Sequence, residues 1–460
     1  MLLTKIKIEN LNENLLKNSE FPNFHLKNSL NFDQLIAVTN LYGNYLVIAG
    51  AGTGKTRVII YRTLVLLKLG ISDENILILT FTNKAVLELK NRIKEHSPNT
   101  NVVIETFHSF AYKFLKKFSV NKNFSIINRN ETLKIFKHIK FISIEDLLSL
   151  LYLFTYNTLE FKNRFKAFNK KEKEIIFLAF SNFEKIKKEK NLLSFHDLIF
   201  NFIELLKIKD IPLPFSHIMV DEFQDTDPFQ IELLKLLKCE NIFAVGDDFQ
   251  SIYSFRGALV DNFFNFPYFF KNTRTILLKE NFRSTPSLIN FTNHISKTLK
   301  FSFKKELISN LKDFEKPEIH IFKTFQDEYN GILLKIENIV KKEDSSSIAI
   351  LFRNNFLVTL YKEYFKHFKN IDILTIHSAK GLEWDFVFLP TLLDGILPSL
   401  FSTVSNLEEE KRLFYVACSR PKKGLFLSYP LYFYCQFGFF QKPSTFLDSL
   451  DETLFNVKRG

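Results

Sequence analysis

The sequence predicts an α/β protein with two parallel sheets, and three observations lead to this fold class. Short apolar runs rich in Ile, Val, Leu and Phe recur along the chain, most of them end in polar or glycine-containing turns, and helical stretches such as 84–95 separate many of them. Such runs are typical of parallel strands that are covered on both faces. They fall into two sets, so we expect two α/β domains with ligands at the carboxyl ends of the strands. The predicted strands are 45–49, 76–81, 102–107, 217–220 and 242–245 in the first set, and 318–322, 347–352, 371–376, 386–390 and 424–428 in the second.

A phosphate-binding loop is predicted after the first of these strands. The sequence from Ala49 to Thr56 reads AGAGTGKT, and the residues that follow it have the apolar period of a helix. Glycines let backbone amides approach phosphate oxygens, and the N-terminus of the helix adds partial positive charge. We expect Lys55 to bind the β and γ phosphates of ATP and Thr56 to bind Mg²⁺. The general pattern begins with Gly, whereas this loop begins with Ala. The predicted nucleotide-binding residues of the loop are Ala49, Gly50, Ala51, Gly52, Thr53, Gly54, Lys55 and Thr56.

Residues 111–195 interrupt the first set of strands. They lack clear strands and carry many lysines, as in 170–190, and we interpret them as a helical insertion in the first α/β domain. The predicted organisation is therefore a first domain of 1–110 plus 196–274, an insertion of 111–195, and a second domain of 275–460.

An Asp-Glu pair follows the predicted strand 217–220. Asp221 and Glu222 stand directly after its apolar residues, downstream of the phosphate loop, which is the arrangement of a Walker B motif. We expect Asp221 to bind Mg²⁺ and Glu222 to act as the general base for the attacking water. An acidic surface turn is the alternative, and the position of the pair at the end of an apolar strand argues against it.

Length and composition agree with a multidomain globular protein. The chain has 460 residues, of which 46% are hydrophobic and 24% are charged, with only 13 Gly and 13 Pro. A chain of this length usually forms about two to four domains, and the composition excludes a disordered or low-complexity protein. The 54 Phe residues accompany abundant Lys, Asn and Ile, so a single Phe carries no functional weight on its own.

The net charge indicates the kind of binding partner, and the cysteine content bears on metal sites and on the redox compartment. The chain has 62 Lys and Arg against 50 acidic residues, a net charge of +12. This excess favours a polyanionic partner such as nucleic acid or a membrane surface, although a lysine-rich composition is an alternative explanation. Cys239, Cys418 and Cys435 are scattered and form no CxxC pair, which argues against a disulfide framework, a zinc ribbon and an iron–sulfur cluster and favours a reducing compartment.

No membrane partner is expected. Residues 1–16 lack the long apolar core and cleavage site of a signal peptide. The uncharged stretch 424–440 contains a proline, three tyrosines and a glutamine, so we interpret it as buried strand and loop rather than a membrane span. We therefore expect a cytoplasmic protein.

The motifs and their order resemble those of superfamily 1 DNA helicases of the UvrD/Rep/PcrA type over nearly the whole chain. The resemblance implies two RecA-like parallel-sheet P-loop domains: 1A, which carries the helical insertion 1B, and 2A. The 2B insertion of longer relatives is missing, because only residues 353–371 separate the neighbouring segments. The matching segments are NFDQ (31–34), AGAGTGKT (49–56), TFTNKA (80–85), TFHS (106–109), SFHDL (194–198), DEFQDTDPFQ (221–230), GDDFQSIYSFRGA (246–258), ENFRST (280–285), LTIHSAKGLEWDFVFLP (374–390) and EEEKRLFYVACSRPKKGL (408–425).

The resemblance implies further roles at the nucleotide, with ATP and Mg²⁺ as cofactors. Gln34 is expected to read the adenine edge. Phe282 is expected to stack on the adenine in place of the family's tyrosine, and Glu383 to contact the ribose. Gln250 is expected to sense the γ-phosphate. The expected catalytic residues are Lys55, Asp221, Glu222, Gln250, Arg283 and Arg420.

Two arginines are expected to act as arginine fingers, because a planar and permanently charged guanidinium suits the charge that develops on the transferring phosphoryl group. They are Arg283 and Arg420. Because Arg420 lies in the second predicted domain, ATP is expected to bridge the two domains, so that hydrolysis drives their closing and opening.

The resemblance also implies contacts with DNA. Phe81, Tyr253 and Phe255 are expected to stack on bases, an interaction worth about 1–3 kcal/mol per base that tolerates any sequence. A packing role is the alternative for each Phe. The expected contacts with the DNA backbone are Lys84, His108 and His377, and a structural role is the alternative for both histidines.

The implied function is that of an ATP-dependent helicase or translocase that moves 3′→5′ on single-stranded DNA in replication, repair or recombination. Its partners would be single-stranded DNA and junctions of single- and double-stranded DNA, and a partner protein could substitute for 2B. Two alternatives stay open. One is a translocase that strips proteins from DNA without processive unwinding, and the other is a non-catalytic nucleic-acid binding protein, against which the intact catalytic positions argue.

Overall fold

The computed structural model describes residues 29–119, 122–142, 147–148, 150–151, 154, 159–253, 260–300, 302–365, 368, 371–399, 407–435 and 438–459. These residues form two compact units. The first contains the described residues up to Val47, together with Thr56–Gly246 and Tyr253–Ile276. The second contains Ile48–Lys55, Asp247–Ile252 and the described residues from Leu277 onward.

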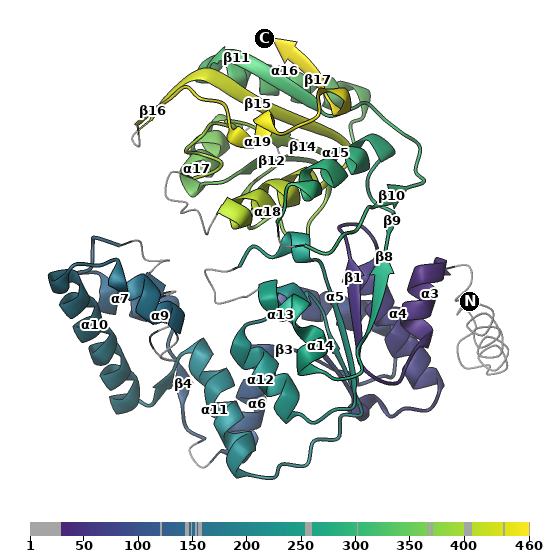
Figure 1. The fold of residues 1–460 in the computed structure, drawn as a ribbon, viewed down its shortest axis with the longest axis vertical. Helices are drawn as coiled ribbons and strands as arrows, with labels where there is room; N and C mark the ends of the chain where they lie inside the picture. The colour runs from purple at the N-terminus through teal and green to yellow at the C-terminus, as the bar shows by residue number, and fades with distance from the viewer. Residues whose placement is uncertain are drawn as a thin grey trace. The chain divides into compact units, whose positions relative to one another are not determined.

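A six-stranded sheet with the order β3-β2-β6-β7-β1-β8 forms the centre of the first unit (Figure 1). β2 pairs in parallel with β3 and β6, and β6 pairs in parallel with β7. All residues of β1, β2 and β6 are buried, as expected for strands that are covered on both faces. The strands are β1 (Tyr45–Ala49), β2 (Ile76–Thr80), β3 (Val103–Thr106), β6 (His217–Val220), β7 (Asn241–Gly246) and β8 (Arg274–Leu278).

The five strands predicted in this part of the chain are present, and β8 is the strand that the sequence did not reveal. β8 begins with the exposed residues Arg274 and Thr275, so it lacks the continuous apolar run from which the others were predicted.

Several helices of the first unit begin at side chains that satisfy their free N–H groups. The Oγ1 of Thr106 accepts a hydrogen bond from Ser109 N at the start of α6, and Ser194 and Asp197 form a capping box at the start of α11. α11 packs against both α6 and α12. The helices are α3 (Phe32–Thr39), α4 (Lys55–Lys68), α5 (Asn83–His96), α6 (Phe107–Phe118), α11 (Phe195–Ile208), α12 (Pro228–Leu236), α13 (Val260–Phe264) and α14 (Phe266–Phe269), with the short 3-10 helices η1 (Asp73–Asn75) and η2 (Phe223–Asp225).

The stretch predicted as a helical insertion has a hydrophobic cluster of its own. Phe136 of α7 packs against Phe180 and Phe183 of α10 in this cluster. Two parallel strands, β4 and β5, join its ends, although no strand was predicted there. Each is only two residues long, too short to leave a pattern in the sequence. The elements are β4 (Ser125–Ile126), α7 (Arg129–Phe136), α9 (Leu159–Lys166), α10 (Lys170–Glu189) and β5 (Leu192–Leu193).

The second unit contains a seven-stranded sheet with the order β13-β12-β14-β15-β11-β17, in which β16 also pairs with β15. The pairs are parallel except for β15 with β16. All five predicted strands are present. The last strand, β17, was missed because its four residues are exposed. The strands are β11 (Glu318–Thr324), β12 (Ile348–Phe352), β13 (Ile371–Thr375), β14 (Trp384–Leu389), β15 (Pro421–Cys435), β16 (Gly438–Phe440) and β17 (Asn456–Arg459).

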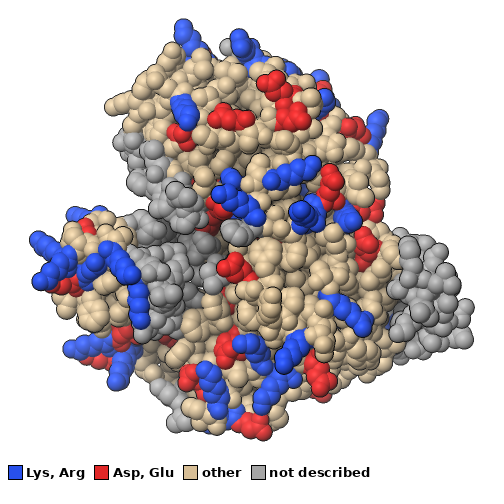
Figure 2. Space-filling view, in the orientation of Figure 1, with Lys and Arg blue, Asp and Glu red and all other residues tan. Residues whose placement is uncertain are grey.

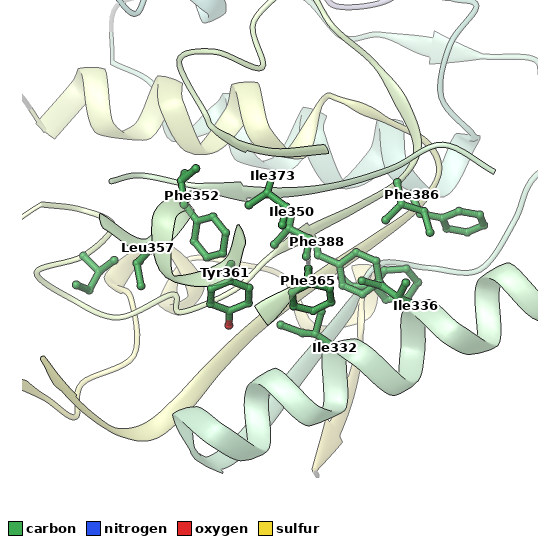
Figure 3. Close-up of a cluster of buried hydrophobic side chains, with 14 of the residues drawn as sticks. Ile332, Ile336, Ile350, Phe352, Leu357, Tyr361, Phe365, Ile373, Phe386 and Phe388 are labelled. Carbon is green, nitrogen blue, oxygen red and sulfur yellow. The ribbon is translucent and has the colours of Figure 1, made fainter. Parts of the chain in front are cut away.

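Helices pack on this sheet over a continuous apolar core. Figure 3 shows Ile332 and Ile336 of α16 directed toward sheet residues such as Ile350 and Phe388, with Tyr361 of α17 in the same cluster. All of these side chains are buried. The helices of this unit are α15 (Pro286–Lys297), α16 (Phe325–Lys342), α17 (Asn355–Tyr364), α18 (Leu407–Cys418) and α19 (Thr445–Asp448), with the 3-10 helices η3 (Asp248–Gln250) and η5 (Glu452–Leu454).

The fold class predicted from the sequence is therefore confirmed as mixed α/β with parallel-strand sheets, which is consistent with two RecA-like domains. The predicted domain boundaries stay a prediction. No helix in the described ranges is long and apolar enough to cross a membrane.

Asp227 caps helix α12 with a buried carboxylate. Its Oδ1 accepts hydrogen bonds from Phe229 N at 2.8 Å and Gln230 N at 2.9 Å. Burial raises the pKa of Asp227 from 3.8 to about 6, although these two hydrogen bonds act in the opposite direction. Because the folded state binds this proton more tightly than the unfolded state, ionisation of Asp227 lowers stability as the pH rises through this range.

We therefore expect Asp227→Asn to stabilise the protein at pH 8 by roughly 1–3 kcal/mol, because Asn caps a helix equally well without a buried charge. The gain should shrink as the pH falls from about 6 toward 4. Thermal unfolding of both proteins across this pH range measures it. Asp451 is the control, since it caps η5 from an exposed position; Asp451→Asn should give no gain at pH 8. An equal gain in stability from Asp227→Asn at pH 4 and pH 8 would contradict the raised pKa of Asp227.

Candidate nucleotide and nucleic-acid sites

The phosphate loop lies between β1 and α4, as predicted. Gly52 and Gly54 have φ angles of +72° and +85°, a backbone conformation that side chains other than glycine disfavour. The Oγ1 of Thr53 donates a hydrogen bond to Gly50 O at 2.9 Å and tightens the turn. The chain then enters α4 at Lys55, so the unsatisfied N–H groups of the first helical turn stand at the end of the loop.

Other residues of the second unit, to which Ile48–Lys55 of the loop also belong, pack closely against this loop. The Nδ2 of Asn281 donates to Ala51 O at 2.6 Å, and Phe282 N donates to Gly52 O at 2.9 Å. A Cβ atom at Gly52 would lie 2.5 Å from Asn281 Nδ2, and one at Gly50 would lie 2.7 Å from the Leu307 side chain. The glycines therefore also permit this close approach, and the loop is held in a fixed shape.

The predicted sensor Gln250 and the predicted arginine finger Arg420 are in direct contact. The Nη2 of Arg420 donates to Gln250 Oε1 at 3.1 Å, and Gln250 Nε2 donates to Asp247 Oδ2 at 2.5 Å. The Nζ of Lys380 donates to the backbone oxygen of Gln250 at 2.7 Å. Gln250 and Arg420 are only 2% and 1% exposed, so their polar groups depend on these partners.

Arg283 forms an ion pair with Glu383. Its Nε donates to Glu383 Oε2 at 2.7 Å, and its Nη1 donates to Ser419 O at 3.2 Å. Lys422 pairs with the same carboxylate at 3.0 Å. Burial alone would raise the pKa of Glu383, but the two cations and their hydrogen bonds outweigh it and lower the pKa. The ring of Phe282 is 44% exposed, which leaves a face accessible for stacking.

The Asp-Glu pair follows β6 with a strained backbone. Glu222 has φ +50° and ψ 42°, a left-handed conformation that is rare for residues other than glycine and often found at functional sites. Asp221 Oδ1 accepts from Glu222 N at 3.0 Å, and Gln224 Nε2 donates to Glu222 Oε2 at 2.6 Å. Gln224 is buried, and a Cβ atom at Gly246 would lie 2.5 Å from its Oε1. The position of Glu222 thus depends on two residues to which the sequence analysis gave no role.

The donor set suits Mg²⁺. Thr56 and Asp221 offer a hydroxyl and a carboxylate, the hard oxygen ligands that this ion prefers. Among the described residues, no group of three or more His, Cys, Asp or Glu could hold a metal by itself. Mg²⁺ in nucleotide sites usually takes about one or two protein carboxylates, together with phosphate oxygens and water, so these residues fit the ion.

Gln34 occupies the third position of helix α3. Its Oε1 accepts from Asn31 N at 3.2 Å in a capping box, and the residue is 1% exposed. The hydrogen bond fixes the orientation of the carboxamide. Its predicted contact with adenine stays a prediction.

A cavity of about 340 Å³ in the first unit brings two of the predicted DNA contacts together. Phe81 and His108 line it with Phe195, Tyr112 and Lys113. The rings of His108 and Phe195 meet edge to face at 5.6 Å, and Phe195 is 54% exposed. Phe195 received no role from the sequence; its place in the SFHDL segment was the available signal.

The other predicted DNA contacts lie elsewhere. Lys84 is exposed on α5, Tyr253 is half-buried in a loop, and His377 is half-buried in a turn. Phe255 lies outside the described residues.

The chain has a glycine loop between a strand and a helix. It also has an Asp-Glu pair directly after a buried parallel strand. Together these features define a P-loop nucleotide-binding protein. Comparison with known proteins identifies the family within this class. Residues 30–271 match the UvrD/REP helicase N-terminal domain, and residues 276–367 and 356–432 match the UvrD-like helicase C-terminal domain. The chain belongs to the UvrD/Rep helicase family, which confirms the resemblance inferred from its motifs.

Three relatives illustrate the similarity. The ATP-dependent DNA helicase Rep of Buchnera aphidicola subsp. Schizaphis graminum is 34% identical over 380 residues, which cover 76% of this chain and 57% of the relative. A probable DNA helicase of Mycoplasma pneumoniae is 31% identical over 444 residues, 86% of this chain and 83% of the relative. The ATP-dependent DNA helicase PcrA of Staphylococcus aureus is 31% identical over 368 residues, which cover 74% of this chain and 50% of the relative. The chain thus spans about half the length of the Rep and PcrA relatives.

Proposed function

We propose that the chain is an ATP-dependent DNA helicase or translocase that moves 3′→5′ on single-stranded DNA in replication, repair or recombination. The observation that carries the proposal is the contact between Gln250 and Arg420. It joins a buried amide to a buried guanidinium, the two groups expected to respond to the γ-phosphate. The names of the relatives, which are ATP-dependent DNA helicases, support the same function.

We propose that ATP is bound through its phosphates by the loop amides and Lys55. Mg²⁺ held by Thr56 and Asp221 would neutralise charge on the phosphate oxygens. Glu222 orients the attacking water and accepts its proton. The proposed contacts with adenine and ribose are Gln34, Phe282 and Glu383.

Arg283 and Arg420 stabilise the charge on the transferring phosphoryl group in this proposal. Arg420 belongs to the domain predicted from residue 275 onward, whereas Lys55 belongs to the first predicted domain. Hydrolysis would therefore be coupled to movement between the two predicted domains.

Single-stranded DNA and its junctions with double-stranded DNA are the proposed nucleic-acid partners. Phe81 and Phe195 would stack on bases at the cavity of the first unit. The proposed role of Tyr253 is also stacking, and Lys84, His108 and His377 would contact the backbone. Figure 2 shows Lys and Arg side chains gathered over the region of α10, with acidic side chains among them. Phosphate contacts release counterions, so affinity should fall as salt rises.

The short connection between β12 and β13 favours a second candidate, a translocase that strips proteins from DNA without processive unwinding. α17 ends at Tyr364 and β13 begins at Ile371, and this short connection supports the predicted absence of a 2B insertion. A partner protein could substitute for it. We propose a cytoplasmic location, since the proposed substrate is DNA.

Strand displacement on a 3′-tailed duplex, measured beside translocation on single strands, separates the two candidates. Translocation with displacement supports the helicase. Translocation without displacement supports the second candidate, and displacement of a 5′-tailed duplex alone would contradict the proposed polarity.

The proposed hydrolysis predicts that Lys55→Ala and Glu222→Gln abolish DNA-stimulated ATP turnover. Loss of a general base usually lowers a rate by about 10²–10⁴-fold, and Glu222→Gln should still bind nucleotide because the phosphate loop is intact. Steady-state hydrolysis with and without single-stranded DNA measures the effect. Glu232→Gln, on α12 with a side chain 39% exposed, is the control and should retain full turnover. Undiminished turnover in purified Lys55→Ala protein would contradict the proposal.

The proposed stacking predicts that Phe195→Ala weakens binding to single-stranded DNA by about 1–3 kcal/mol. Phe177→Ala is the matched control, since Phe177 lies on α10, is 53% exposed and is not among the residues that line the cavity. Fluorescence anisotropy with a labelled oligonucleotide measures both affinities. Equal affinities for the two variants would exclude Phe195 from the DNA site.

A further inference from the structure

Lys305 is a buried lysine outside the recognised motifs. Its side chain is 0% exposed, and its Nζ lies 2.5 Å from an oxygen of Asp247 and 2.5 Å from an oxygen of Asp248. The ring of Phe249 lies 3.8 Å from the same nitrogen. A charge that is removed from water is destabilising unless it is paired and hydrogen-bonded, so this arrangement needs an explanation.

The carboxylate of Asp247 connects Lys305 to Gln250. Its Oδ1 pairs with Lys305, and its Oδ2 accepts from Gln250 Nε2 at 2.5 Å. The other end of the same carboxamide, Gln250 Oε1, accepts from Arg420. A continuous series of hydrogen bonds thus runs from Lys305 through Asp247 and Gln250 to Arg420.

The charge state of Asp247 determines which way the Gln250 carboxamide points. Burial alone would raise the pKa of Asp247, but Lys305 and Lys55, with hydrogen bonds from Lys305 and Gln250, outweigh it and lower the pKa. An ionised carboxylate only accepts hydrogen bonds. Gln250 must therefore direct its NH₂ group to Asp247 and its oxygen to Arg420.

The segment 303–309 that carries Lys305 is fixed at several points. The Nδ2 of Asn293 donates to Leu307 O at 2.8 Å, and Leu307 N donates to Asn293 Oδ1 at 3.0 Å. Phe303 N donates to Asp248 Oδ2 at 2.8 Å. Strand β10 (Ile308–Ser309) pairs in parallel with β9 (Glu280–Asn281). The backbone thus has little freedom to move Lys305 away from Asp247.

We propose that Lys305 is a positioning residue for ATP hydrolysis: its ion pair holds Asp247 in place, and Asp247 in turn orients the Gln250 carboxamide toward Arg420. The inference rests on the proposed function, because it assigns Lys305 to the same hydrolytic site. Lys305 itself touches no predicted nucleotide-binding residue by hydrogen bond among the described residues, and it acts through Asp247.

A double-mutant cycle with the full chain tests the proposal. DNA-stimulated kcat and the KM for ATP are measured for Lys305→Met, Gln250→Ala and the double variant. Lys305→Met should lower kcat at least about tenfold and change KM less than about threefold, because an orienting contact rather than substrate binding is lost. In the Gln250→Ala background, Lys305→Met should change kcat less than about threefold, because both changes remove the same interaction.

Lys187 provides a matched control. It is also buried and pairs with two carboxylates, Asp197 at 2.7 Å and Glu184 at 2.8 Å, and the ring of Phe183 lies 5.2 Å from its Nζ. Lys187→Met removes a comparable buried charge outside the hydrogen-bond series. It should lower the unfolding temperature without lowering kcat, and its effect should be the same with and without Gln250→Ala.

The results of the cycle separate the positioning role of Lys305 from the proposed function. If Lys305→Met lowers kcat by the same factor in the presence and absence of Gln250→Ala, the positioning role is wrong while the proposed function stands. If Gln250→Ala leaves stimulated turnover unchanged, the proposed role of Gln250 is wrong, and that of Lys305 with it. If Lys305→Met does not fold, the cycle is run with Lys305→Gln, which also removes the charge but keeps a hydrogen-bond donor and should show the same loss of kcat and the same dependence on Gln250. If neither variant folds, Lys305 is a folding determinant and the positioning role is rejected.

Discussion

The hydrogen bond between Gln250 and Arg420 is the contact on which the proposed nucleotide site depends. Both side chains are buried, so each must find its partners inside the protein. Arg420 also donates to Val416 O and Ser419 Oγ, while Gln250 donates to Asp247. Since an unsatisfied buried polar group destabilises a fold by about 1–3 kcal/mol, these groups hold one another in a single arrangement.

The phosphate loop is rigid for a related reason. Gly52 and Gly54 adopt left-handed φ angles, and Asn281 and Leu307 pack against the loop where larger residues would collide with them. A loop already in its binding shape loses little conformational entropy when a ligand arrives. Glu222 adds local backbone strain beside Asp221, which the buried Gln224 helps to maintain through its hydrogen bond.

Strands and motifs could be predicted because local patterns in the sequence encode them. Residues that meet only through long-range contacts could not be predicted in this way. Apolar runs predicted the interior strands of both sheets and the edge strands β3 and β13, whereas the exposed starting residues of β8 and all of β17 carried no such pattern. At the proposed site, the motifs singled out Lys55 and Gln250 as candidates. They did not identify Lys305, because its contact with Asp247 spans 58 positions and a lysine in a lysine-rich chain gives no signal. Phe195 was hidden in the same way among 54 phenylalanines.

The pairing of β4 with β5 has a consequence for protein engineering. Ser125 N donates to Asn191 O at 3.1 Å, and Ile127 N donates to Leu193 O at 2.9 Å, so the chain enters and leaves the insertion at neighbouring points. A segment with adjacent ends and a hydrophobic cluster of its own is a self-contained cassette. It could be excised and replaced by a short turn, or exchanged for the corresponding segment of a relative, without stretching the sheet that carries the phosphate loop.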